Sequence, residues 1–73
     1  MTVGLPNKKT IGARLRALRG DLTLEAVSKA TGIGRSALNM YEIGHRVPRD
    51  DAKIALAMFY GKTVDEIFFA PDE

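Results

Sequence analysis

The chain has 73 residues and no cysteine, with 45% hydrophobic residues and a formal net charge of +2. This length predicts one domain, and the lack of cysteine excludes a disulfide framework and a thiolate metal site. No apolar run approaches the ~20 residues of a membrane-spanning helix, and residues 1–9 lack the apolar core of a signal peptide, so we expect a cytoplasmic protein.

The basic and acidic residues are divided unequally along the chain. Residues 1–49 carry nine bases and three acids, whereas residues 50–73 carry two bases and six acids. The first part therefore has a net charge of +6 and the second a net charge of −4. A polyanion such as nucleic acid would be attracted to the first part and repelled by the second. Two ordinary solvated surfaces would explain the same charges, so the charge division alone does not establish nucleic-acid binding, and a DNA-binding motif in the basic part is needed to support it.

The first segments in chain order are an arm and a helix. We expect residues 1–9 to form a flexible basic arm, because glycine, proline and asparagine interrupt any periodic pattern there. Thr10 is expected to cap a first helix that ends near Gly20. Its apolar residues recur at helical spacing, at Ile11, Leu15 and Leu18.

Residues 23–41, TLEAVSKATGIGRSALNMY, predict two short amphipathic helices joined by a tight turn. Thr23 should cap the first of these helices, and Gly32 should end it in the left-handed conformation. Its narrow buried face is expected from Ala26, Val27 and Ala30. The second helix should run over residues 35–43. The core shared by the two crossed helices is expected from Leu24, Val27, Thr31, Ile33, Leu38 and Tyr41. This pattern is typical of a helix-turn-helix, which lays one helix into the DNA major groove.

A loop and a fourth helix are expected next. Residues 45–48 should form the loop, and Asp50 or Asp51 should begin the helix, which Gly61 closes. Its inward-facing residues are expected to be Leu56, Ala57 and Tyr60.

A short fifth helix is predicted at the end of the domain. Thr63 and Glu66 have the spacing of a capping box, and Pro71 should end the fold. The apolar residues of this helix are Val64, Ile67 and Phe68. The resulting domain covers residues 10–69, and residues 70–73 form a tail.

Three stretches resemble a known family when they are taken in order: LRALR, then LTLEAVSKATGIGRSALNMYEIGHRVP, then IALAMFYGKTVDEIF. They look like the DNA-binding domain of the phage Cro and repressor type, the XRE family. The resemblance runs from about Thr10 to Phe69 and implies an all-α, five-helix lambda-repressor-like domain. Family members are mostly sequence-specific transcriptional regulators that bind operators as dimers. The resemblance therefore implies double-stranded DNA and a second copy of the chain as partners, and it favours a repressor.

The resemblance also implies roles for individual residues. Helix 35–43 would be the recognition helix, with four residues facing base edges: Arg35, Ser36, Asn39 and Met40. Positions that usually touch phosphate match Thr23, His45, Arg46 and Arg49. A structural pair that joins the first helix to the recognition helix matches Arg19 and Glu42. The family usually has glutamine where this chain has Leu24, which removes one anchor.

The chemistry of the recognition-helix residues leaves several contacts open. Arg35 can fork onto guanine O6 and N7 or bind a phosphate. Asn39 can pair bidentately with adenine, although a surface asparagine needs no such reason. Met40 can pack on a thymine methyl or fill the space between helices.

The remaining signals concern partners and excluded functions. An apolar surplus that so small a domain cannot bury predicts a dimer surface at Met58, Phe59, Phe68 and Phe69. An antitoxin-like or adaptor protein that keeps the fold without specific DNA binding would use the same patch. An enzyme is not expected, because the chain lacks a phosphate-binding glycine loop, a plausible carboxylate pair and a nucleophile with its base. With His45 as its single histidine, we also expect no metal, cofactor or small-molecule ligand.

Overall fold

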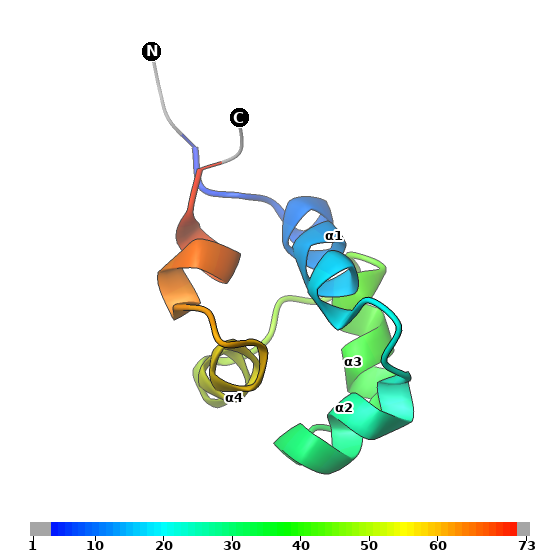
Figure 1. Ribbon diagram of the computed structural model, residues 1–73. Coiled ribbons are helices and arrows are strands. Elements are labelled where there is room, and N and C mark those ends of the chain that lie inside the picture. The colour runs from blue at the N-terminus through cyan, green and yellow to red at the C-terminus, as the bar shows by residue number, and fades with distance from the viewer. Residues whose placement is uncertain (1–3, 72–73) are drawn as a thin grey trace.

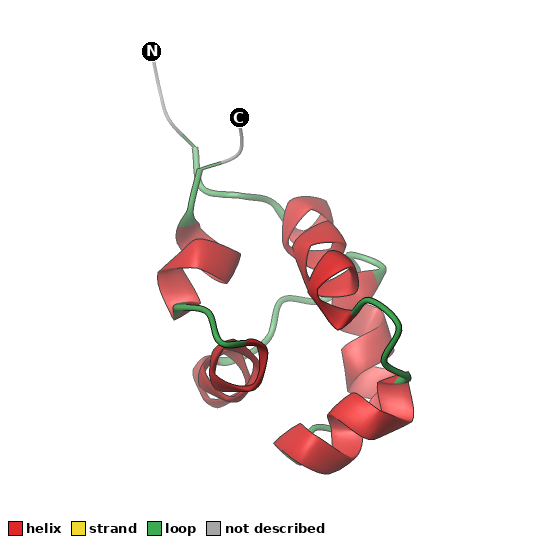
Figure 2. Ribbon diagram, viewed as in Figure 1, coloured by secondary structure: helices red, strands yellow, loops and turns green. Residues whose placement is uncertain are grey.

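The computed structural model describes residues 4–71, which form five helical segments and contain no β-strand (Figures 1 and 2). The segments are α1 (Lys8–Arg19), α2 (Leu24–Thr31), α3 (Arg35–Glu42), α4 (Asp50–Tyr60) and a π-helical turn, η1 (Asp65–Phe69). The predicted all-α, five-helix class is confirmed. No helix within residues 4–71 combines the length and the apolar character needed to cross a membrane. Residues 1–3 of the predicted arm and residues 72–73 of the predicted tail lie outside the described residues.

α1 begins earlier than predicted and has a different cap. The side chain of Asn7 accepts a hydrogen bond from the backbone N–H of Thr10 at 2.9 Å, so the prediction of Thr10 as the cap was wrong. Asparagine ranks above threonine as an N-cap residue, and its side-chain oxygen here accepts from a free N–H group of the first turn. Lys8 and Lys9 therefore belong to the first turn of α1. At its other end the helix stops at Gly20, as predicted.

The helix-turn-helix forms where the sequence predicts it. Thr23 caps α2 by accepting a hydrogen bond from the backbone N–H of Ala26 at 3.0 Å, and Gly32 ends α2 with a φ of 77°. The turn is held by the hydroxyl of Ser28, which donates a hydrogen bond to the carbonyl of Ile33 at 2.6 Å. α3 follows after the turn and covers nearly the whole predicted range, ending at Glu42 instead of residue 43.

α4 and η1 also have the predicted local signals. α4 begins at Asp50 and is closed by Gly61, which has a φ of 68°. The capping box before η1 is complete, because Thr63 donates its backbone N–H to the Glu66 carboxylate at 2.8 Å. In return, the backbone N–H of Glu66 donates to the Thr63 hydroxyl at 3.0 Å. The end of α4 and the start of η1 are therefore both determined by residues close together in the chain.

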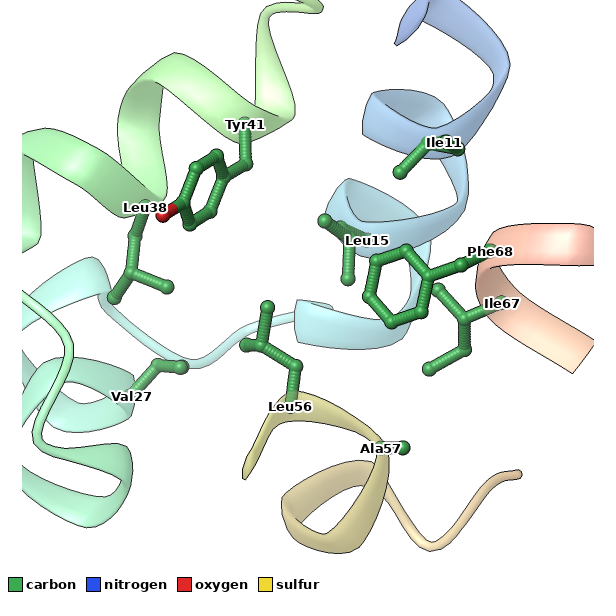
Figure 3. Packing of buried hydrophobic residues seen from close by; sticks show 9 residues of the cluster. All are labelled: Ile11, Leu15, Val27, Leu38, Tyr41, Leu56, Ala57, Ile67 and Phe68. Atoms are coloured by element: carbon green, nitrogen blue, oxygen red, sulfur yellow. The ribbon is translucent and has the colours of Figure 1, made fainter. Parts of the chain in front are cut away.

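One apolar core joins all five segments (Figure 3). Its buried members are Ile11, Leu15, Val27, Leu38, Tyr41, Leu56, Ala57, Ile67 and Phe68. The predicted buried face of α2 was partly wrong, because Ala26 and Ala30 are exposed. Leu24, Val27 and Thr31 face inward, as predicted for the core of the two crossed helices, at the three- and four-residue spacing of a single helical face.

Phe68 is a core residue, and its prediction as part of a dimer surface was wrong. Its side chain is only 2% exposed and lies beside Leu15 and Ile67 (Figure 3). η1 packs against α1, so the two consecutive residues Ile67 and Phe68 both fill the space between that helix and α4. This burial depends on where η1 lies, which the spacing of apolar residues in the sequence does not specify.

Candidate nucleic-acid interface

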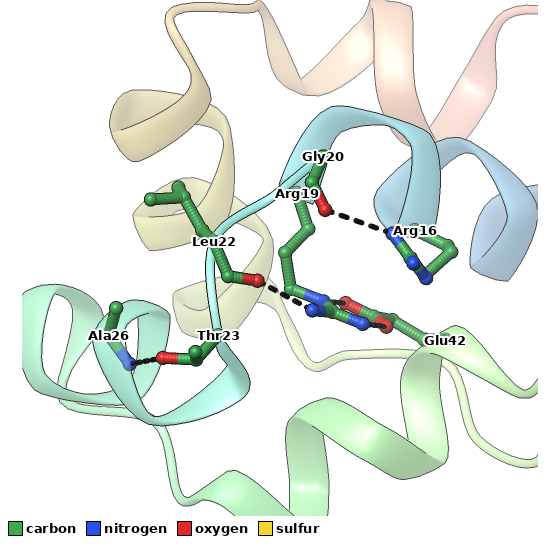
Figure 4. A network of polar contacts seen from close by, with 7 residues as sticks. All are labelled: Arg16, Arg19, Gly20, Leu22, Thr23, Ala26 and Glu42. Carbon is green, nitrogen blue, oxygen red and sulfur yellow. Dashed lines mark hydrogen bonds and ion pairs between the residues drawn. The ribbon is translucent and has the colours of Figure 1, made fainter.

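An ion pair joins the last residue of α1 to the last residue of α3 (Figure 4). Arg19 donates from Nε to Oε2 of Glu42 at 2.7 Å and from Nη2 to Oε1 at 3.0 Å, and its Nη1 donates to the Leu22 carbonyl at 2.6 Å. The side chains of the pair are 15% and 9% exposed, respectively. The hydrogen bond to Glu42 raises the pKa of Arg19 above its ordinary value. The predicted pair is thus present and mostly shielded from water, and it holds α3 on α1.

A second contact between α1 and α3 depends on Gly12, which has no side chain. A Cβ added at Gly12 of α1 would lie 2.5 Å from the carbonyl oxygen of Glu42 and 2.6 Å from that of Tyr41. These are backbone atoms, so no side-chain rotation could relieve the overlap. Gly12 therefore allows α1 to approach the end of α3 more closely than any other residue would, and it helps to set the position of α3.

The outward face of α3 carries the residues predicted to read bases. Arg35, Ser36 and Asn39 are exposed, whereas Leu38 and Tyr41 of the same helix are buried on its inner face. The predicted fourth reader is placed differently, since Met40 is half-buried. This half-buried position fits both roles considered for Met40, an apolar contact with a thymine methyl and the filling of space between helices. Contacts of these four residues with bases stay predictions.

The loop after α3 folds back over the end of that helix. The carbonyl of Met40 accepts hydrogen bonds from the backbone N–H groups of His45 at 2.9 Å and Arg46 at 3.3 Å. The side chains of His45, Arg46 and Arg49 are exposed, as a phosphate contact requires. Thr23 is also exposed, although its hydroxyl already caps α2. His45 and Arg46 therefore lie in the loop at the C-terminal end of α3, whereas Arg49 is the N-cap residue of α4 and Thr23 that of α2.

The basic side chains of residues 4–71 fall into two groups. Six of them interact with groups of the protein itself: Arg14, Arg16, Arg19, Lys29, Lys53 and Lys62. The other five make no hydrogen bond or ion pair within the described residues: Lys8, Lys9, Arg35, Arg46 and Arg49. All five belong to the basic part of the chain. They lie in the first turn of α1, at the start of α3, in the loop after α3 and at the N-cap of α4, so basic side chains without an ion pair in residues 4–71 flank both ends of α3.

Several large apolar side chains of α4 and η1 are exposed, and we call this set, Ile54, Met58, Phe59 and Phe69, the α4 face. Met58 is 77% exposed and Ile54 53% exposed, and Phe59 and Phe69 are exposed to a smaller extent. A shallow groove of about 360 Å³ runs beside it, lined by Ala30, Thr31, Ala55, Met58 and Phe59. Sequence reasoning identified Met58, Phe59 and Phe69 but missed Ile54, although its spacing of four residues from Met58 places both on one side of the helix.

Comparison with known proteins relates this geometry to a family. The family model described as Helix-turn-helix matches residues 13–67. The restriction-modification controller protein C.AhdI from Aeromonas hydrophila is similar in structure, with a TM-score of 0.76 and 28% identity over 84% of this chain and 96% of that chain. The DNA-binding domain of BldD is 30% identical over 93% of this chain and 99% of that chain, with a TM-score of 0.68.

A more distant structure shares the fold alone. The clp gene regulator ClgR from C. glutamicum has a TM-score of 0.74 and 22% identity, over 90% of this chain and 88% of that chain. No curated protein matches the sequence significantly. The family match covers most of the chain, and the resemblance to the Cro and repressor type is confirmed. The chain belongs to the XRE-type helix-turn-helix family of DNA-binding transcriptional regulators.

Proposed function

We propose that this chain is a sequence-specific repressor that binds a two-fold symmetric operator as a homodimer, with α3 in the major groove. The observation that carries the proposal is the exposed row of Arg35, Ser36 and Asn39 on α3, flanked by basic side chains that have no partner within residues 4–71. Such a surface offers hydrogen-bonding groups to base edges and positive charge to the backbone. Repression would follow from occlusion of the promoter, with no enzymatic step.

The proposed contacts with bases and with the DNA backbone come from different residues. Arg35 begins the helix, so its guanidinium can reach guanine O6 and N7 in the groove. Asn39 lies one turn further on the same exposed side and can donate to and accept from adenine. His45, Arg46 and Arg49 would hold the DNA backbone, and Thr23 would do so at the start of α2. These backbone contacts set the orientation of α3 and carry no sequence information.

A second copy of this chain is the proposed partner on the α4 face. Dimeric helix-turn-helix proteins place two recognition helices ~34 Å apart on one side of the duplex. α3 packs on α1 and α2, and Ile54 and Met58 of α4 remain exposed, so pairing through α4 would leave the α3 surface free. Burial of apolar area contributes about 25 cal/mol per Å², so even a small α4 contact supports weak association. We propose the cytoplasm as the location of this DNA-binding protein.

Selection of bound duplexes from a random DNA pool tests the proposal directly. We expect a palindromic consensus, bound by two copies of the chain in sedimentation and in gel shifts. An adaptor or antitoxin-like protein that uses the α4 face for another protein would give no enriched sequence and no shift of bulk DNA at low salt. A consensus without internal symmetry, bound one to one, would retain the DNA function and refute the dimer.

A further inference from the structure

Lys9 of α1 packs against the loop that follows α3, although the two are far apart in the sequence. A Cβ added at Gly44 would lie 3.1 Å from both Cα and Cγ of Lys9, and 3.4 Å from its backbone nitrogen. Gly44 also has a φ of 79°, a left-handed conformation that glycine adopts without strain. The loop therefore accepts the backbone of Lys9 directly against its own backbone, and the start of α1 is part of the surface at the end of α3.

The surroundings of Lys9 contain basic side chains that have no ion-pair partner among residues 4–71. Gly44 is followed by His45 and Arg46, whose backbone N–H groups both bind the Met40 carbonyl and hold the loop against α3. Lys9 and Arg46 are exposed and make no ion pair within residues 4–71. Glu42, at this end of α3, is already bound to Arg19. Basic side chains that lie near each other without an ion-pair partner favour an anion that lies between them.

We propose that Lys9 binds a phosphate of the DNA backbone, next to the phosphate held by Arg46, and that α1 thereby becomes part of the DNA-binding surface. The inference rests on the proposed function, since it places the duplex on the α3 surface. The four-carbon stem of lysine lets its ammonium act as a point charge toward a phosphate. The contact would fix the C-terminal end of α3 relative to the backbone while Arg35, at the other end, reads a base.

The test compares the salt dependence of binding in three variants. Lys9→Gln removes the charge, Lys9→Arg keeps it, and Lys62→Gln removes a matched exposed charge in the acidic part of the chain. One phosphate contact contributes a slope of about 0.9 in log K against log salt, so the affinity ratio of wild type to Lys9→Gln should fall about 3.5-fold for each half-site between 50 and 200 mM salt, which is about 12-fold for a dimer on two half-sites. The loss should be equal on operator and scrambled DNA, and Lys9→Arg and Lys62→Gln should keep the wild-type slope.

Phosphate ethylation interference supplies a second readout that a change in stability would not produce. Wild type should be sensitive at one more phosphate per half-site than Lys9→Gln, adjacent to the phosphate whose sensitivity is lost in Arg46→Ala. An unchanged slope and an unchanged interference pattern in Lys9→Gln would overturn the inference. If Arg46→Ala and Arg35→Ala still weaken binding in that case, the proposed function stands without Lys9. If none of the three affects binding, the proposed function fails as well.

Discussion

Arg19 and Glu42 join the ends of α1 and α3 through two hydrogen bonds, from Nε and Nη2 to the two carboxylate oxygens, at 2.7 and 3.0 Å. A bidentate pair of this kind fixes both the distance and the relative orientation of its partners. Both side chains are mostly shielded from water. The pair holds the recognition helix against the rest of the domain, so its contribution is to structure, and through structure to DNA binding.

Glu42→Ala should destabilise the domain strongly. Removal of the carboxylate leaves the Arg19 guanidinium largely buried, with the Leu22 carbonyl as its remaining partner. Breaking one side of a buried pair costs about 3–5 kcal/mol, and we expect about 3 kcal/mol here because the pair retains some exposure. The midpoint of thermal unfolding should fall by roughly 12 °C or more. Glu25→Ala, which removes an exposed partner 3.9 Å from Lys29, is the control and should change stability by less than about 1 kcal/mol. Equal melting of the two variants would refute the structural role.

The sign of the stability change in Gly12→Ala tests the close contact between α1 and α3. In an exposed helix, alanine is more stable than glycine by about 1 kcal/mol. Here the added methyl group would overlap the carbonyl oxygens of Tyr41 and Glu42, and overpacking costs about 1–3 kcal/mol. We therefore expect Gly12→Ala to lower the free energy of unfolding in urea titrations. Gly4→Ala, with no atom within 4 Å of the added carbon, should have little effect. Stabilisation by Gly12→Ala would show that the helices are further apart.

Arg35→Ala and Arg46→Ala should separate the reading of bases from the binding of backbone. Arg46→Ala should weaken binding to operator and to scrambled DNA equally and lower the salt slope by about one per half-site. Arg35→Ala should lose about 1–3 kcal/mol on the operator and relax the preference at one base pair. Titration of both variants against both duplexes over a range of salt measures these effects. If Arg35→Ala lowers the affinity for both duplexes alike, Arg35 contacts a phosphate, and Ser36, Asn39 and Met40 read the sequence.

Met58→Glu should weaken the proposed dimer. A carboxylate at the most exposed apolar side chain of α4 would have to lose its hydration when two copies pair. We expect the dissociation constant of the dimer to rise at least tenfold, which corresponds to about 1.4 kcal/mol. Analytical ultracentrifugation measures this, with Ala17→Glu as a control that adds the same charge to an exposed position on α1. Unchanged dimerisation in Met58→Glu would place the interface elsewhere.

The contribution of Glu66 to stability should depend on pH. Hydrogen bonds from the backbone N–H of Thr63, followed by that residue's side chain, lower the pKa of Glu66 below its ordinary value of 4.5. The folded state thus favours the ionised carboxylate, and this stabilisation is present above pH 4.5 and lost as the pH falls through the lower folded pKa. The difference in melting temperature between wild type and Glu66→Ala should accordingly be full at pH 7 and shrink at pH 3. A melting-temperature difference of the same size at pH 7 and pH 3 would contradict this. Glu66→Gln keeps a hydrogen-bond acceptor, so its melting temperature should fall less than that of Glu66→Ala at pH 7.

Local signals in the sequence were sufficient for most of the helix boundaries. The caps at Thr23, Gly32 and Gly61 and the reciprocal pair of Thr63 and Glu66 each involve groups a few residues apart, so neighbouring residues decide them. The exposed face of α3 also follows from helical periodicity once Leu38 and Tyr41 turn inward. The first cap was the exception, because Asn7 and Thr10 can both cap a helix and the stronger of the two, Asn7, starts the helix one turn earlier than predicted.

The sequence by itself therefore determined the helix-turn-helix, the order of the helices and the side of α3 that faces outward, because these depend on periodicity and short-range hydrogen bonds. The tertiary structure decided which apolar residues are buried: Phe68 fills the core, whereas Met58 remains exposed. It also separated the basic side chains that have partners from those that do not, and it brought Lys9 against Gly44. Burial and ion pairing depend on which surfaces meet across the fold, and the spacing of residues along one helix carries no information about the helix that will cover it.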